Sequence, residues 1–115
     1  MIKIKLSKRN LAVITAYERG YRVKNGRVYN PEGRLRKTFI QSATHSPYLC
    51  FTIRVNGISQ LVPVHRLVAF QKFKNKIFTP NIMVRHLNGK ALSNNDQNIQ
   101  IGTARDNAAD KKNKK

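Results

Sequence analysis

The chain has 115 residues, of which 23 are Lys or Arg and 5 are Asp or Glu, so its formal net charge is +18 at pH 7. Charge of one sign on this scale favours a polyanionic partner, nucleic acid first and an anionic membrane second. The length predicts a single domain over 1–115, and a hydrophobic share of 40% can build a modest core. No run of 18 or more apolar residues is present, which excludes a transmembrane helix. Cys50 is the only cysteine, which excludes intramolecular disulfides. So few acids also disfavour an enzyme built on paired carboxylates.

The chain is expected to begin with a helix over 7–19. Ser7 can accept hydrogen bonds at the helix start, and Gly20 can adopt the left-handed conformation that ends a helix. The β-branched residues inside the segment weaken this prediction, but the apolar residues still recur at near-helical spacing.

Two β-hairpins should follow the first helix. Asn25-Gly26 and Asn56-Gly57 are dipeptides typical of type I′ turns, and apolar residues alternate on both sides of the second turn. Between the hairpins, a stretch rich in Arg and Lys is expected to form a loop or an edge strand.

The second half of the chain predicts a different order of elements. A helix is expected over 65–73, then a basic stretch in which lysines alternate, then short apolar strands over 82–84 and 99–101. Thr103 and Asp106 have the spacing of a capping box, which predicts a final helix to about residue 112.

Three polar residues mark this second half. His86 follows the first short strand, Asn98 precedes the second, and Asn107 lies inside the final helix. The chain here resembles the HNH nucleases, specifically the small phage and intron-encoded branch related to homing endonucleases. Four stretches carry the resemblance, in order: VHRLVAF at 64–70, VRHLNG at 84–89, NIQIGT at 98–103 and DN at 106–107. Each stretch is weak evidence alone, and together they are specific.

The resemblance implies an α+β fold in which an N-terminal helix and β-hairpins (1–63) precede a ββα-metal nuclease unit (64–112) and a basic tail (113–115). His86 would be the general base, since its unperturbed pKa of about 6.5 leaves it mostly neutral in cells. Asn107 would bind one divalent cation, Mg²⁺ or alternatively Mn²⁺, through its amide oxygen. Asn98 would bond across the polar loop and keep the imidazole aimed.

The chain departs from the family at one position. Many HNH enzymes have a metal-binding Asp directly before the base, where this chain has Arg85. Asp110 lies one helical turn after Asn107, on the same helix face, so we take Asp110 as the replacement metal ligand. Arg85 could instead hold the scissile phosphate with its planar fork of donors.

Other polar residues have simpler interpretations. We expect His65 to be structural, at the start of its helix, and Asn88, Asn94 and Asn95 to be turn residues. With so few acids to pair them, basic clusters are expected to bind DNA phosphates. The predicted contacts are Arg34, Arg36, Lys37, Lys72, Lys74 and Lys76.

These observations predict a divalent-metal-dependent endonuclease of phage or mobile-element type, which nicks or cuts duplex DNA. It would act in the cytoplasm of a bacterial or phage-infected cell, with no membrane partner, as a monomer or a dimer. One alternative is a DNA-binding protein of the same fold whose site is inactivated by Arg85. The other is a basic structural RNA-binding protein of ribosomal type, which charge and size alone suggest.

Overall fold

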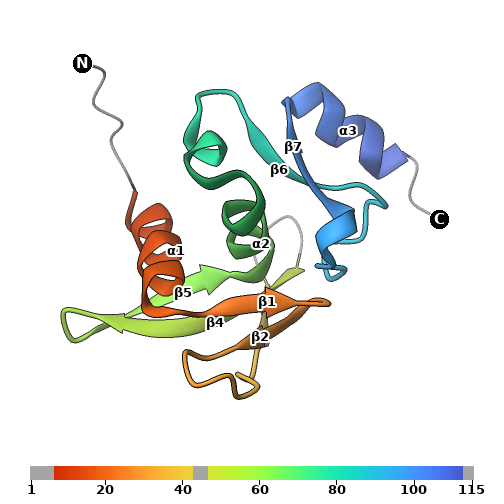
Figure 1. Cartoon of the computed structure of the whole chain (residues 1–115). Coiled ribbons are helices and arrows are strands. Elements are labelled where there is room, and N and C mark those ends of the chain that lie inside the picture. Colours follow the sequence, from red (N-terminus) through yellow and green to blue (C-terminus); the bar gives the residue numbers. More distant parts are fainter. Residues whose placement is uncertain (1–6, 43–46, 113–115) are drawn as a thin grey trace.

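The computed structural model describes residues 7–42 and 47–112 of the chain (Figure 1). The predicted basic tail at 113–115 lies outside the described residues. The helices are α1 (Lys8–Arg19), α2 (Val64–Phe73) and α3 (Ala104–Lys112), with short 3₁₀ helices η1 (Lys74–Phe78) and η2 (Asp96–Asn98). The strands are β1 (Arg22–Lys24), β2 (Arg27–Tyr29), β3 (Phe39–Ser42), β4 (Pro47–Val55), β5 (Ile58–Pro63), β6 (Met83–His86) and β7 (Ile99–Gly102).

Local sequence chemistry explains the N-terminal elements, and the predictions there are confirmed. The Ser7 hydroxyl accepts a hydrogen bond of 3.2 Å from the backbone N–H of Asn10, and Gly20 ends α1 at a φ of 104°. Both turn dipeptides have positive φ at each residue, as type I′ turns require: 52° and 77° at Asn25-Gly26, and 52° and 78° at the second turn.

The sequence left a loop or an edge strand open for the basic stretch between the hairpins, and it did not assign a strand to Phe39–Ser42, where β3 lies. Strand β3 pairs antiparallel with β4, so the second hairpin becomes a three-stranded sheet in the order β3-β4-β5. Phe39 and Ile40 of β3 are 43% and 53% exposed. Because neither face of this strand is deeply buried, its sequence lacks the alternation that identifies a strand, and pairing with β4 decides its conformation.

One apolar cluster joins the two halves of the chain. It includes Val13 of α1, Phe51 of β4, Leu67 of α2 and Ile99 of β7, all without exposed surface. Figure 1 shows α1 and α2 side by side above β4 and β5, with β6, β7 and α3 beyond α2. The packing thus seats the second half of the chain directly on the first.

The last three elements form a compact unit beside α2. Strand β6 pairs antiparallel with β7 from Met83–Gly102 to His86–Ile99, and α3 packs against both strands. The predicted capping box starts α3: the N–H of Thr103 donates to Asp106 at 3.0 Å, and the N–H of Asp106 donates to the Thr103 hydroxyl at 3.2 Å. The fold is therefore α+β, as predicted. No helix within the described residues is long and apolar enough to cross a membrane.

Candidate functional site

A polar pocket lies where four elements of the fold meet. It has a volume of about 180 Å³ and takes its walls from β4, α2, β6, α3 and the loop after β6. His86 and Asn107, two of the three predicted catalytic residues, both line it. The lining residues are Pro47, Tyr48, His65, Val84, His86, Ala91 and Asn107.

The orientation of His86 is set by Asn94. The Nε2 atom of His86 lies 2.8 Å from Oδ1 of Asn94. With Oδ1 of Asn94 facing the ring, Nε2 is the donor of this hydrogen bond, and the lone pair of a neutral ring then resides on Nδ1. The contact therefore fixes both the ring position and the tautomer that a general base needs.

This role of Asn94 corrects the sequence interpretation, which treated it as a turn residue. Asn94 is only 3% exposed, whereas its neighbour Asn95 is exposed. The two residues are chemically identical, so local sequence could not distinguish them. The fold of the loop between β6 and β7 turns one amide inward and leaves the other in solvent.

Burial lowers the pKa of His86 from its ordinary value of 6.5, and the hydrogen bond to Asn94 offsets part of that effect. Burial disfavours the charged imidazolium, while an acceptor on Nε2 favours it. The net direction keeps the ring neutral at pH 7. A neutral imidazole can accept a proton, so the protonation state suits a base.

Asn98 holds the ends of the polar loop together, as the sequence predicted. Its Oδ1 accepts from the N–H of Asn88 at 2.9 Å, and its Nδ2 donates to Oδ1 of Asn88 at 3.0 Å and to the carbonyl of Ser93 at 2.7 Å. Its own carbonyl accepts from Leu87 at 2.9 Å. Asn98 thus ties the segment after His86 to the start of β7, outside the pocket.

Arg85 and Asp110 have a different arrangement from the one expected. Nε and Nη2 of Arg85 donate to the two carboxylate oxygens of Asp110 at 2.7 and 2.9 Å. The ion pair joins β6 to α3, and Asp110 is 7% exposed. Gly102 leaves room for it, because a Cβ there would lie 2.7 Å from both Arg85 Cδ and Asp106 Oδ2. Because Arg85 and Asp110 bind each other, neither side chain lines the pocket.

The donor set for a metal ion is therefore smaller than the sequence suggested. Asp110 was predicted as a ligand, but both of its oxygens accept hydrogen bonds from Arg85. Within 7–42 and 47–112, no three His, Cys, Asp or Glu side chains gather as a metal site. Among the residues that line the pocket, Asn107 has an amide oxygen, which is a hard donor. An amide oxygen is a ligand type that Mg²⁺ accepts, alongside several waters.

His65 was expected to be only structural, yet it forms part of the pocket wall. Its ring lies between Tyr48 and His86, with ring centres 5.8 and 5.2 Å apart respectively. Burial, together with the positive charge of neighbouring groups, lowers the pKa of His65 to about 3. Sequence reasoning missed this proximity because the two histidines are on separate elements. The one available signal was that each lies in a stretch resembling the same family.

The predicted phosphate contacts divide into two groups. Three are held by the protein itself: Lys72 donates to the carbonyls of Asp96 and Ile99 at 2.6 Å each, Lys74 to that of Gln71 at 2.7 Å, and Arg36 to that of Thr52 at 3.1 Å. Lys72 and Lys74 are nonetheless exposed, as are Arg34, Lys37 and Lys76.

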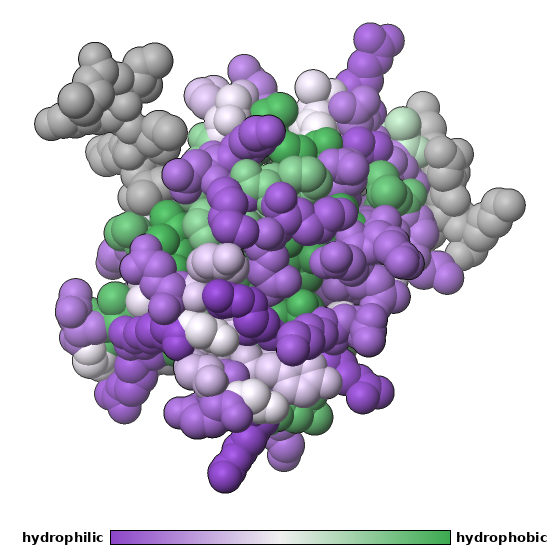
Figure 2. All heavy atoms as spheres, in the orientation of Figure 1, coloured by the Kyte–Doolittle hydropathy of each residue, from purple (hydrophilic) through white to green (hydrophobic). Residues whose placement is uncertain are grey.

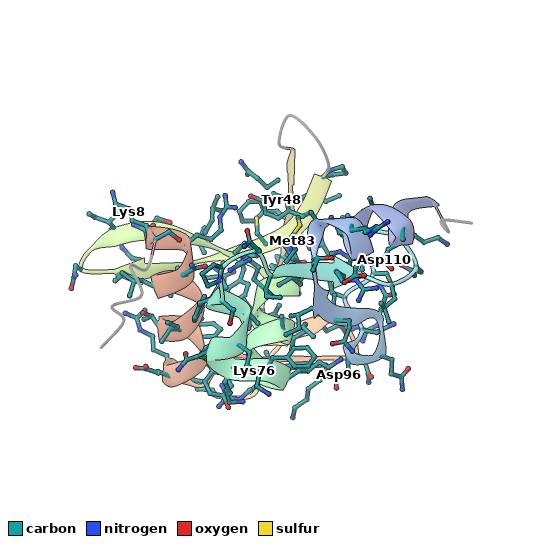
Figure 3. The ribbon with its side chains drawn as sticks, turned by 90° about the horizontal axis from the view of Figure 1, so that it is seen from above. Lys8, Tyr48, Lys76, Met83, Asp96 and Asp110 are labelled. Carbon is teal, nitrogen blue, oxygen red and sulfur yellow. The ribbon has the colours of Figure 1, made fainter. Side chains whose placement is uncertain are left out.

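The expected alternating basic stretch is also replaced by a helix end. Lys72 belongs to α2, while Lys74 and Lys76 belong to the 3₁₀ helix η1, so the three side chains do not form one extended row. Figure 2 shows hydrophilic side chains over most of the visible face, and Figure 3 shows Lys76 on the opposite side of the molecule from Tyr48 of the pocket. Lys76 therefore does not lie beside the pocket.

Comparison with known proteins adds no relative: no family model, no curated protein and no solved structure matches the chain. The interpretation of the site accordingly rests on its residues and their geometry.

Proposed function

We propose that the chain is a divalent-metal-dependent DNA endonuclease of the HNH type, which hydrolyses phosphodiester bonds with His86 as the general base. One observation carries the proposal: His86 and Asn107 line a single pocket, and Asn94 holds the imidazole in the tautomer with a free Nδ1. The net charge of +18 favours a polyanionic substrate.

The proposed reaction uses the pocket residues as follows. Nδ1 of His86 accepts a proton from a water molecule, and the resulting hydroxide attacks the phosphorus of the scissile phosphodiester. The bond from phosphorus to the leaving oxygen then breaks, and that oxygen leaves as an alcohol after it gains a proton from solvent. A divalent cation beside Asn107 would neutralise charge on the phosphate and on the leaving oxygen.

The supporting residues have separate roles in this scheme. Asn94 orients the base, and Asn98 fixes the loop that contains Asn94. Because no carboxylate lines the pocket within the described residues, we expect Mg²⁺ or Mn²⁺ to bind weakly without DNA and more tightly with it. The proposal includes that β6, β7 and α3 form a ββα-metal unit.

A second candidate function is a DNA-binding protein of the same fold that does not cut. The observation in its favour is the ion pair between Arg85 and Asp110, which leaves no carboxylate on the pocket wall within the described residues. An HNH enzyme commonly has an acidic ligand at the position of Arg85. A chain without it could retain the fold and the charge while it lacks the metal.

Cleavage of supercoiled plasmid distinguishes the two functions. Wild type with Mg²⁺ or Mn²⁺ should yield open-circular or linear DNA, and EDTA should abolish the products. His86→Ala should reduce the rate by about 10²–10⁴-fold, the usual contribution of a general base. Leu87→Ala, which alters an exposed neighbour of the base, is the matched control and should cut like wild type.

The other outcomes are equally informative. No cleavage with either metal, together with tight duplex binding at low salt, would contradict the nuclease and support the binding protein. Cleavage that persists in His86→Ala would refute His86 as the base. A strong preference for folded RNA over duplex DNA in the same binding assay would contradict both DNA functions.

A further inference from the structure

Two histidines from separate elements face the same pocket. His65 lies in the first turn of α2 and His86 ends β6, and both line the pocket with Asn107. Their ring centres are 5.2 Å apart, and the ring planes are inclined by 52°. The rings are therefore neighbours without being stacked face to face.

This separation equals that of two imidazoles bound to one metal ion. Zinc binds imidazole nitrogen at about 2.0–2.1 Å in tetrahedral sites, and that geometry places the centres of two bound rings about 5 Å apart. Simple packing of two rings could give the same spacing, so the hydrogen bonds of the rings decide what the pair can do.

Each ring has a nitrogen that the protein leaves without a partner. Nε2 of His86 is engaged by Asn94, which leaves the lone pair of Nδ1 free. Nδ1 of His65 is buried and has no hydrogen-bond partner among the described residues. Buried polar atoms are almost always satisfied, and an exception calls for an explanation.

We propose that His65 and His86 form a binding site for a transition-metal ion of the class that prefers imidazole, such as Zn²⁺ or Co²⁺. The amide oxygen of Asn107 and water complete the coordination. This site is distinct in its chemistry from a hard Mg²⁺ site, which prefers oxygen donors. It also goes beyond the proposed nuclease function, because binding of Zn²⁺ or Co²⁺ requires no DNA and no cleavage.

The surrounding charge predicts how the site behaves. Arg66 and Arg9 act on His65 from nearby, and the chain as a whole carries +18. This field opposes a divalent cation, so the affinity should be modest. Salt screens repulsion between charges, and the Debye length falls from about 10 Å at 0.1 M to about 3 Å at 1 M. Metal binding should therefore tighten as NaCl is raised, the reverse of binding to DNA.

Occupancy of the site has one functional consequence, which rests on the proposed function. A metal ion bound to Nδ1 of His86 removes the lone pair that accepts the proton from water. Zn²⁺ should then inhibit cleavage supported by Mg²⁺, and a chelator selective for Zn²⁺ should restore it.

Direct metal binding to the purified chain without DNA tests the proposal. Titration with Co²⁺ should produce the visible absorption of a low-symmetry, tetrahedral ion at one equivalent, and calorimetry with Zn²⁺ should give the same stoichiometry. His65→Phe and His86→Phe keep a ring in each position and remove its nitrogens, so each should weaken binding by at least about tenfold. Leu87→Ala should bind like wild type, and circular dichroism verifies that each variant is folded.

The outcomes separate this proposal from the nuclease. Absence of binding in wild type, or binding by folded His65→Phe equal to wild type, overturns the metal site and leaves the nuclease proposal unaffected. Binding that weakens with rising NaCl also overturns it. A chain that binds Co²⁺ as predicted but, once freed of Co²⁺ and Zn²⁺, cuts no DNA with Mg²⁺ or Mn²⁺ supports the metal site and contradicts the nuclease.

Discussion

The ion pair between Arg85 and Asp110 should be a substantial source of stability, and Arg85→Met tests this. The substitution removes the guanidinium and keeps an apolar side chain of comparable length. It leaves the Asp110 carboxylate, in a side chain that is 9% exposed, without the two donors that it now has at 2.7 and 2.9 Å.

The burial of the pair sets the expected magnitude. Removal of one partner of a fully buried pair costs about 3–5 kcal/mol, whereas exposed pairs contribute about 0.2–1 kcal/mol. The Arg85 side chain is 18% exposed, so the pair lies between these limits. We expect Arg85→Met to lower the free energy of unfolding by about 2 kcal/mol, and Asp110→Asn by about 1 kcal/mol because the amide still accepts a hydrogen bond.

Urea unfolding followed by circular dichroism measures these changes. A double-mutant cycle with Arg85→Met and Asp110→Leu isolates the coupling between the two side chains, which should be about 1–2 kcal/mol. Arg105→Met is the matched control. It removes an exposed arginine from α3, the helix that contains Asp110, and should change the stability by less than about 0.5 kcal/mol.

Two results would refute the reasoning. If Arg85→Met destabilises the protein no more than Arg105→Met does, the ion pair contributes nothing measurable. A coupling energy close to zero in the cycle would mean that the two side chains act independently. In either case, the ion pair would position the two side chains without stabilising the fold.

Four further predictions follow from other contacts. Asn94→Ala should lower the cleavage rate at least about tenfold while plasmid binding stays unchanged, because the base loses the partner that orients its ring; an unchanged rate would mean that the amide does not orient the base. Lys72→Met should lower the free energy of unfolding, measured in urea, by about 1–2 kcal/mol, because two carbonyls lose a charged donor. Lys76→Met should leave the stability unchanged and reduce the slope of log affinity for DNA against log salt concentration by about 1. Gly102→Ala should lower the melting temperature, because the added Cβ would lie 2.7 Å from neighbouring atoms; an unchanged melting temperature would show that these side chains move aside freely. The pKa of His65 falls from 6.5 to about 3 on folding, so at a pH between these values the unfolded chain binds a proton that the folded chain does not. The urea midpoint, measured in EDTA, should therefore fall as the pH drops from 7 to 5. His65→Phe should flatten this pH dependence.

Much of the fold was predictable because its causes are local. The type I′ turn at Asn56-Gly57 needs two residues that tolerate positive φ, and the capping box at Thr103 needs only side chains three residues apart. Strand β3 was missed because nothing within its four residues specifies an extended conformation. Its pairing with β4, which begins five residues after β3 ends, supplies that information.

The candidate site was predictable in its residue types and only partly in its geometry. The order and spacing of His86, Asn98 and Asn107 were visible in the sequence, and His86 and Asn107 do line one pocket. The assignment of Asp110 as a ligand used helix periodicity alone. Periodicity places a side chain on a helix face but cannot reveal that Arg85, from another element, already binds it.

The sequence by itself determined the charge, the turns, the helix caps and the polar residues available for chemistry, because each depends on composition or on neighbours a few positions apart. Only the tertiary structure decided which polar groups become buried and which partners they find. Asn94 rather than Asn95 meets His86, and His65 comes to lie beside it, because packing of α2 against β6 and β7 brings distant segments together. Hydrogen-bond energy and pKa depend on burial, and burial is a property of the whole fold.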